Sequence, residues 1–291
     1  MSPQGNYSIT KLPNYQMISV LQLGIVDYAT ALRLQETLVS LRKQGGIPDV
    51  LLLLEHPPVI TLGRNAKTKN IVASPEVLAQ RGVEVFECDR GGDVTFHGPG
   101  QLVAYPIFDL RGFPSETGNR KTLGAIEYVR RLEEVLIRTC ADFGVATKRI
   151  SGLTGVWTEP DAGANSESSP EHNSTTKANE SKIAALGVHI SGGVSSHGIA
   201  LNVNTDLSFF NLIIPCGIAS KPVTSMSREL GHPVGLQEVA HLLSRNFGNV
   251  FSSQVLWLDS LDDLLGTKTG VPMTLPDDLR KIHPDDGSTW A

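Results

Sequence analysis

The stretch SKIAALGVHISGGVSSHGIALNVN, residues 181–204, decides the fold class. It holds two strand-like segments, KIAALGVHI at 182–190 and SHGIALNV at 196–203, and the segment LTGVWTE at 153–159 precedes them. These strands follow one another without a helix between them, as hairpins do. Strands earlier in the chain do not alternate strictly with helices. The sequence therefore predicts an α+β domain with a mixed sheet, not a doubly wound parallel sheet.

The remaining elements follow from hydrophobic periodicity. Strand patterns occur at MISVLQLG, DVLLLLE, VITLG, VEVFECD and QLVAYPIFDL, which are residues 17–24, 49–55, 59–63, 83–89 and 101–110. A helix is predicted from the N-cap Asp27 to Gly45, with Ala31, Leu34, Leu38 and Leu41 on its buried face. Two further helices are predicted at 123–144 and 236–251. Their predicted buried faces are Ile126, Val129, Leu132, Leu136 and Cys140 in one, and Val239, Leu242, Leu243 and Phe247 in the other.

Composition and charge exclude several classes of protein. The net charge of −5 argues against a nucleic-acid partner, although Arg64, Lys67 and Lys69 form a local basic group. Three cysteines in 291 residues fit a reducing compartment better than a disulfide framework. No apolar run is long enough to span a membrane, and no signal peptide is recognisable. We therefore expect a cytoplasmic protein with no membrane association. Separately, we expect a monomer.

Two kinds of segment lie outside the predicted core. Residues 159–181, EPDAGANSESSPEHNSTTKANES, contain almost no large apolar side chains, so burial cannot compensate the entropy of ordering them. We predict a disordered insert here, at the tip of a hairpin inside one domain of residues 17–266. Residues 1–16 are predicted to form a flexible lead-in, and residues 267–291 a tail.

Cys216 is the cysteine most open to a chemical role. Cys140 continues an apolar helical stripe and Cys88 belongs to a strand pattern, so both are predicted to be packing residues. Cys216 instead lies between Pro215 and Gly217, at a corner of the backbone. That position fits a buried turn thiol and also fits an exposed nucleophile.

Further candidates for a binding or catalytic role are the polar residues of one glycine-rich segment and of one apolar strand. RGGDVTFHGPGQ, residues 90–101, fits a ligand-binding loop or a plain hairpin turn, and it matches no phosphate-binding motif. Lys182 begins an otherwise apolar strand, so it lies at a sheet edge or points into a site. The spacing of His97, His189 and His197 matches no zinc motif, and we expect no metal.

Three segments together resemble one family. They are RGGDVTFHGPGQLVAYPIFDL, GVW followed by KIAALGVHI, and SHGIALNVNTDLSFFNLIIPCGI, in this order along the chain. They closely resemble the octanoyltransferases of lipoate biosynthesis, also called lipoyl(octanoyl) transferases or lipoate–protein ligase B. The resemblance runs from about Val20 to about Phe251 and implies the α+β catalytic fold of biotin and lipoate protein ligases. The insert before Lys182 departs from the family, whose members usually have a short turn there.

The resemblance implies a reaction and a set of site residues. An octanoyl group passes from acyl carrier protein to Cys216 as a thioester, and then to a lysine amine of a lipoyl domain. The acceptors are lipoyl domains of 2-oxoacid dehydrogenase complexes and the glycine cleavage H protein. Lys182 is the lysine that favours the thiolate of Cys216, and neither ATP nor a cofactor is required. The implied substrate-binding residues are Arg90, Gly91, Gly92, Asp93, Val94, Thr95, Phe96, His97, Ala185, Leu186, Gly187, Gly198, Ile199 and Ala200.

Two other functions compete with this interpretation. An ATP-dependent lipoate or biotin protein ligase forms an acyl-adenylate and needs no cysteine. A non-catalytic protein that binds lipoyl domains or acyl carriers needs neither Cys216 nor Lys182. The presence of both residues at the family positions favours the transferase.

Overall fold

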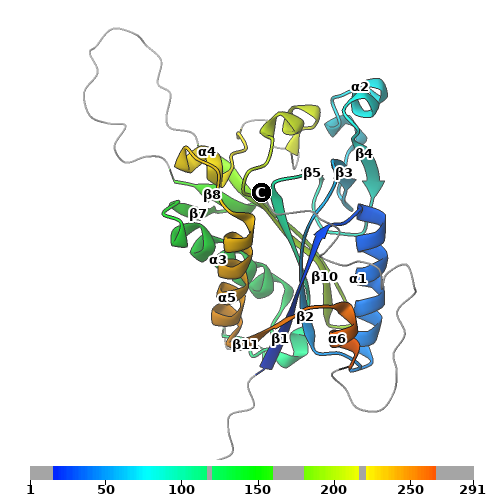
Figure 1. The fold of residues 1–291 in the computed structure, drawn as a ribbon, viewed down its shortest axis with the longest axis vertical. Coiled ribbons are helices and arrows are strands. Elements are labelled where there is room, and N and C mark those ends of the chain that lie inside the picture. The colour runs from blue at the N-terminus through cyan, green and yellow to red at the C-terminus, as the bar shows by residue number, and fades with distance from the viewer. Residues whose placement is uncertain (1–15, 117–119, 160–179, 216–220, 267–291) are drawn as a thin grey trace, which may run out of the picture.

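The computed structural model describes residues 16–116, 120–159, 180–215 and 221–266 (Figure 1). Residues 1–15 of the predicted lead-in, the tail and the centre of the insert lie outside the described residues, and so does Cys216, whereas Gln16 already belongs to the first strand. The strands are β1 Gln16–Ile25, β2 Asp49–Glu55, β3 Val59–Leu62, β4 Glu84–Glu87, β5 Val94–His97, β6 Gln101–Ile107, β7 Thr147–Ile150, β8 Leu153–Thr158, β9 Lys182–Ser191, β10 Val194–Asn202 and β11 Ser253–Leu258.

The helices lie between these strands in an irregular order. They are α1 Tyr28–Lys43, α2 Pro75–Gln80, α3 Ala125–Asp142, α4 Met226–Leu230, α5 Leu236–Phe251 and α6 Leu261–Gly266, with short 3-10 helices η1 Thr68–Asn70, η2 Leu110–Gly112 and η3 Leu207–Leu212. None of the helices described is both long enough and apolar enough to cross a bilayer.

The main sheet is mixed, as the sequence predicts. Within the described residues its strand order is β11-β1-β2-β6-β10-β9-β8-β7. The β11–β1 and β1–β2 pairs are parallel, and the pairs from β2 to β7 are antiparallel. β9 and β10 form the hairpin expected from the opening stretch, closed by Gly192 and Gly193 at φ +59° and +85°. Two consecutive positive φ angles suit a tight hairpin turn and favour glycine at both positions.

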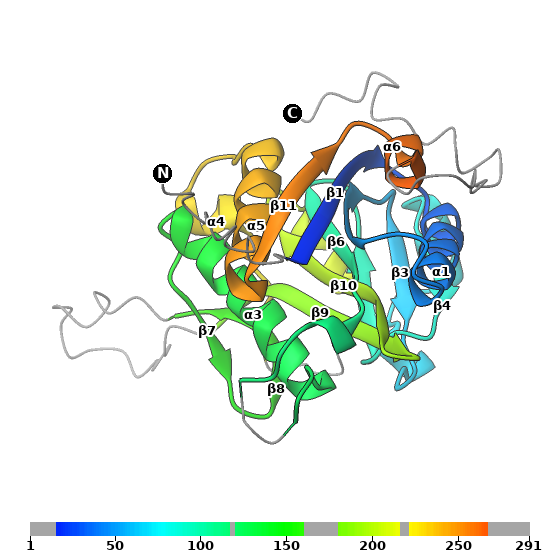
Figure 2. The same ribbon diagram turned by 90° about the horizontal axis from the view of Figure 1, so that it is seen from below.

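Helices cover both faces of this sheet, which explains the continuous apolar run of β2. Figure 2 shows α3 and α5 on one side of the strands and α1 on the other. Leu51 and Leu53 belong to the core under α3 and α5, whereas Leu52 and Leu54 belong to the core under α1 and α6. Because successive side chains of a strand point to opposite faces, both sets must be apolar when both faces are covered.

The helices confirm most of the predicted faces and correct one position. Asp27 caps α1 by accepting a hydrogen bond from the Thr30 amide at 2.9 Å. Cys140 is fully buried, but Ile126 is 81% exposed, so its predicted place on the buried face is wrong. Ile126 lies at the exposed start of α3, next to the exposed Ala125, whereas Glu133, seven residues further along nearly the same side of the helix, is fully buried. On α5, Val239, Leu243 and Phe247 are buried and Leu242 is half-buried.

A second sheet has the order β4-β3-β5 and lies beside the main one. The glycine-rich segment leads from β5 in this sheet to β6 in the main sheet, so it is not a plain hairpin turn. Residues Val94 and Phe96 of β5 pack into a small core of their own with Ile60 and Leu212. The segment therefore joins the two sheets, and the site described below lies between them.

The ends of the predicted insert are part of the β8–β9 hairpin. The Thr158 amide donates to the Ser181 carbonyl at 2.9 Å, and the Glu159 amide donates to the Ala146 carbonyl at 3.0 Å. Glu180 pairs with Lys148 at 2.9 Å and with Lys221 at 2.5 Å. The structure therefore moves both bounds of the predicted insert inward from 159 and 181, because Glu159, Glu180 and Ser181 have defined partners.

Candidate active site

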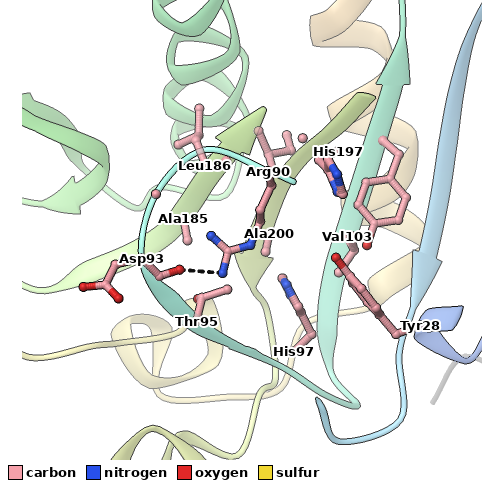
Figure 3. Close-up of a pocket in the computed structure, with 15 residues that line it drawn as sticks. Tyr28, Arg90, Asp93, Thr95, His97, Val103, Ala185, Leu186, His197 and Ala200 are labelled. Atoms are coloured by element: carbon pink, nitrogen blue, oxygen red, sulfur yellow. Dashed lines mark hydrogen bonds between the residues drawn. The ribbon is translucent and has the colours of Figure 1, made fainter. Parts of the chain in front are cut away.

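A narrow cavity separates the main sheet from the loop before β5 (Figure 3). It encloses about 470 Å³, including the open space at its mouth. Eleven of the fourteen predicted substrate-binding residues line it: Arg90, Gly92, Asp93, Thr95, His97, Ala185, Leu186, Gly187, Gly198, Ile199 and Ala200. The structure thus brings together three segments that are far apart in the sequence.

Three predicted residues do not line this cavity. Val94 and Phe96 alternate along β5 with Thr95 and His97, so they point to the opposite face and into the small core. Gly91 serves the loop, since its amide donates to the Val188 carbonyl of β9 at 3.0 Å. That bond holds the loop against the main sheet and closes one side of the cavity.

Arg90 anchors the loop that forms the roof of the cavity. Its Nη2 donates to the carbonyl oxygens of Thr61 and Asp93, both at 2.7 Å, and its Nε donates to Thr61 Oγ1 at 3.1 Å. Its Nη1 donates to the Gly91 carbonyl at 3.0 Å. Figure 3 shows the guanidinium between Asp93 and Thr95, at the cavity wall. Arg90 is therefore a scaffold residue as well as a lining residue.

One part of the lining, formed by Tyr28, His97 and Tyr105, carries neutral polar groups, and His56, which does not line the cavity, is hydrogen-bonded to Tyr105. His56 Nδ1 lies 2.6 Å from the Val26 carbonyl and must donate to it, so Nε2 accepts from the Tyr105 hydroxyl at 2.7 Å. Burial lowers the pKa of His56 to about 4 and of His97 to about 3. Burial likewise raises the pKa of Tyr28 and Tyr105 above the usual range. These groups bring no net charge to the cavity at neutral pH.

His197 adds a hydrogen-bonded acid–histidine pair to the lining. Its Nε2 lies 2.7 Å from Asp89 Oδ1, and its backbone φ is +53°. Burial lowers the pKa of His197, although Asp89 opposes this effect. The carboxylate of Asp89 also lies 3.6 Å from His189 Nδ1. Among the described residues, no cluster of three or more possible metal ligands includes these histidines.

Lys182 is buried at the start of β9, with 7% of its surface exposed. Its Nζ lies 5.1 Å from the centre of the Trp157 ring, within the range of a cation–π interaction. Its side chain passes against Gly155 of β8, where a Cβ atom would lie only 2.5 Å from Lys182 Cε. Lys182 lines a smaller cavity of about 270 Å³, including open space at its mouth, which shares Thr95, Ala185 and Ala200 with the larger one. The amine therefore lies close to one end of the apolar cavity.

Described residues on both sides of Cys216 reach this same place. Pro215, which precedes Cys216, lines the smaller cavity together with Lys182. Downstream, the Lys182 amide donates to the Pro222 carbonyl at 2.8 Å, and the Thr224 amide donates to the Lys182 carbonyl at 2.9 Å. The backbone before and after the segment 216–220 is thus held beside Lys182.

Several lining residues were missed by the sequence reasoning. They are Tyr28, Val103, Tyr105 and His197 in the larger cavity, and Gly155 and Trp157 beside Lys182. Tyr28 opens a helix and Tyr105 is part of an ordinary strand pattern, so neither carries a local signal. His197 lies within a predicted strand and was considered only as a metal ligand. The GVW motif was noted, but its contact with Lys182 depends on the pairing of β8 with β9.

Comparisons with known proteins identify the family of the chain. A sequence profile described as the lipoyl protein ligase A/B catalytic domain matches residues 27–248. The octanoyltransferase of Koribacter versatilis is 61% identical over 272 residues, covering 93% of this chain and 98% of that protein. The octanoyltransferase of Acidobacterium capsulatum is 56% identical over 251 residues, covering 86% of this chain and 96% of that protein.

Solved structures show the same fold at low sequence identity. A lipoate-protein ligase A bound with ATP has a TM-score of 0.59 and 15% identity, covering 83% of this chain and 88% of its own. A bipartite lipoate protein ligase from Thermoplasma acidophilum has a TM-score of 0.58 and 16% identity, with the same coverage. At these identities the likeness concerns the fold alone.

Proposed function

Because the chain belongs to the lipoyl protein ligase A/B catalytic domain family, among its octanoyltransferases, we propose that it transfers octanoyl groups through a cysteine thioester. The protein is an acyltransferase of lipoate biosynthesis. In the proposed reaction the donor is octanoyl-acyl carrier protein. The acceptor is a lysine amine on a lipoyl domain of a 2-oxoacid dehydrogenase complex or on the glycine cleavage H protein.

The position of Lys182 is the observation that carries this proposal. Its amine is buried where the small cavity meets the apolar one, and Pro215 lines the same cavity. Consecutive Cα atoms are about 3.8 Å apart, so Pro215 limits how far the backbone of Cys216 lies from this cavity. This arrangement supports a thiolate–ammonium pair at the mouth of an acyl-binding cavity.

The apolar cavity suits a straight acyl chain. Its wall on the main sheet includes Val103, Ala185 and Ala200, and the small side chains leave a slot beside β9. Lys182 and Gly187 are five residues apart, which corresponds to about 16 Å of strand. An extended eight-carbon chain is shorter than this. We propose that the octanoyl chain lies along β9, with its carbonyl carbon nearest Lys182.

In the first step, the Cys216 thiolate attacks the carbonyl carbon of the donor thioester. The new C–S bond forms, the C–S bond to the donor breaks, and the departing thiolate takes a proton from the Lys182 ammonium. A thiol is a poor nucleophile until it ionises, and a nearby cation stabilises the thiolate. The products are the acyl-enzyme, the free thiol of the donor and a neutral Lys182 amine.

In the second step, the neutral amine of the acceptor lysine attacks the acyl-enzyme. The C–N bond forms and the bond to the Cys216 sulfur breaks. The proton released by the acceptor nitrogen passes to Lys182, which restores the ammonium beside the restored thiolate. One lysine thus gives a proton in the first step and takes one back in the second, so the cycle closes without a cofactor.

Mass spectrometry of the intact protein after mixing with octanoyl-acyl carrier protein tests the proposal. The wild type is expected to gain one octanoyl group without ATP, whereas Cys216→Ser gains none. An ATP-dependent ligase would show no adduct on Cys216 and would need ATP for transfer. A binding protein without catalysis would transfer nothing to a lipoyl domain. A cytoplasmic location and a monomeric state stay predictions.

A further inference from the structure

An open hollow adjoins the cavity that holds Lys182. It encloses about 1090 Å³, including open solvent, and is bordered by η3, by the segments 213–215 and 221–223, and by α4. We call it the α4 hollow. It shares Phe210, Pro215 and Val223 with the Lys182 cavity. In Figure 1, α4 lies at the same end of the molecule as β8 and β5. The hollow therefore opens to solvent beside the Lys182 cavity.

Two cationic side chains, Lys221 and Arg228, line the α4 hollow. Lys221 pairs with Glu180 at 2.5 Å, but Glu180 also pairs with Lys148 at 2.9 Å. One carboxylate therefore faces two lysines, and this cluster keeps a net positive charge. Among the described residues, no carboxylate forms a salt bridge with Arg228.

The acidic residues near the α4 hollow have other partners. Asp206 lies 3.9 Å from Arg81, and Glu229 accepts a hydrogen bond from the Thr224 hydroxyl. The exposed Lys69 does not line the hollow, but its neighbour in the sequence contacts the hollow's wall. The amide of Ile214 donates to the Asn70 carbonyl at 2.7 Å, next to the exposed Lys69. Lys148, Lys221 and Arg228 together exceed Glu180 and Glu229 by one positive charge, and this excess favours an anion.

We propose that the α4 hollow binds the phosphate of a phosphorylated pantetheine arm, with Arg228 and Lys221 as its cationic ligands. This inference rests on the proposed function, since it names how the acyl thioester reaches Cys216. The arm that carries an acyl thioester on a carrier is long and thin, and a phosphodiester joins it to the protein. A guanidinium binds phosphate oxygens through paired N–H donors, whereas an ammonium acts as a point charge.

The charge of the α4 hollow also distinguishes the donor from the acceptor. The acceptor lysine must reach the same thioester after the donor has left, and it arrives mostly as an ammonium. Cations in the hollow give this group no binding energy. The positive charge is therefore useful for the donor step alone.

Small donors separate the phosphate from the rest of the carrier. Rates of Cys216 acylation would be measured with octanoyl-pantetheine and with octanoyl-4′-phosphopantetheine, which differ only in the phosphate. The wild type is expected to prefer the phosphorylated donor by about tenfold in kcat/KM, which matches a charge-assisted contact of ordinary strength. Arg228→Gln is expected to lose most of this preference. Arg245→Gln, an exposed change on α5 where Arg245 pairs with Asp142, is expected to keep it.

A binding measurement tests the α4 hollow apart from catalysis. Calorimetry with unacylated 4′-phosphopantetheine is expected to show binding to the wild type and binding at least tenfold weaker to Arg228→Gln. A wild type without donor preference, or an Arg228→Gln variant that keeps it, would overturn the site. A third outcome is that neither donor acylates the protein, while phosphopantetheine still binds and its binding still depends on Arg228. That outcome would support the site and contradict the proposed function.

Discussion

Replacing Gly155 by alanine is predicted to disable Lys182 while leaving Lys182 itself in the sequence. The added Cβ would lie 2.5 Å from Lys182 Cε, 3.2 Å from its Nζ and 3.0 Å from the Ala184 carbonyl oxygen. Ordinary carbon–carbon contacts are about 3.5 to 4.0 Å, so the Cε atom must retreat by about 1 Å or more. The retreat moves the ammonium away from its position over Trp157.

Two magnitudes follow for Gly155→Ala. A displacement of about 1 Å in a catalytic group costs on the order of a hundredfold in rate. Gly155 has a φ of +135°, and this conformation strains any other residue by about 1 to 3 kcal/mol. Overpacking adds about 1 to 3 kcal/mol. We therefore expect acyl-enzyme formation to slow about a hundredfold and the free energy of unfolding to fall by a few kcal/mol.

Gly144→Ala is the matched control, because Gly144 has a φ of +80° and no atom within 4 Å of the built Cβ. It reports the cost of backbone strain without a clash at Lys182. Rapid-quench mass spectrometry would follow acyl-enzyme formation, and thermal unfolding would follow stability. If Gly155→Ala and Gly144→Ala are acylated at the same rate, the argument that Gly155 positions Lys182 is refuted.

Two further predictions concern the acyl cavity and the buried histidines. Ala200→Leu fills the place where the two cavities meet. The ratio of kcat/KM for octanoyl transfer to kcat/KM for butanoyl transfer should therefore fall by at least tenfold. An unchanged ratio would show that Ala200 does not line the path of the acyl chain. The pKa values of His56 and His97 are depressed by burial to about 4 and about 3. Below pH 6.5 these histidines therefore bind more protons in the unfolded chain than in the folded one. Their contribution to the free energy of unfolding is complete above pH 6.5 and is lost as the pH falls toward 4. The loss at pH 4 is about 3 kcal/mol per histidine. Denaturant titrations should show a flatter pH dependence in His97→Gln, and a slope equal to that of the wild type would contradict this assignment.

The sequence predicted the elements that local patterns control. The run DVLLLLE became β2, and the alternating segments after Leu153 became the β8–β9–β10 hairpins. Ile126 was misplaced because it fits the same periodic pattern as the buried turns that follow, although the start of the helix is exposed. The α+β class followed from the order of elements, which the chain itself displays.

The sequence predicted only those site residues that belong to a recognisable motif. The segment at residues 90–97 was found as one motif, but its division into cavity-lining and core residues depends on which face of β5 meets the main sheet. Tyr28 and Tyr105 come from different elements, and only the folding of α1 and β6 toward the same cavity gives them a role. The contact of Trp157 with Lys182 likewise arises from a β-bulge in the β8–β9 pairing, which no local pattern encodes.

The pH dependence of Cys216 alkylation by iodoacetamide tests most directly whether Lys182 stabilises the thiolate. Peptide mass spectrometry would separate Cys216 from Cys88 and Cys140. In the wild type we expect fast alkylation well below the ordinary thiol pKa of about 8.5, and in Lys182→Met we expect the midpoint to move up toward that value. Superimposable profiles for the two proteins would contradict the account.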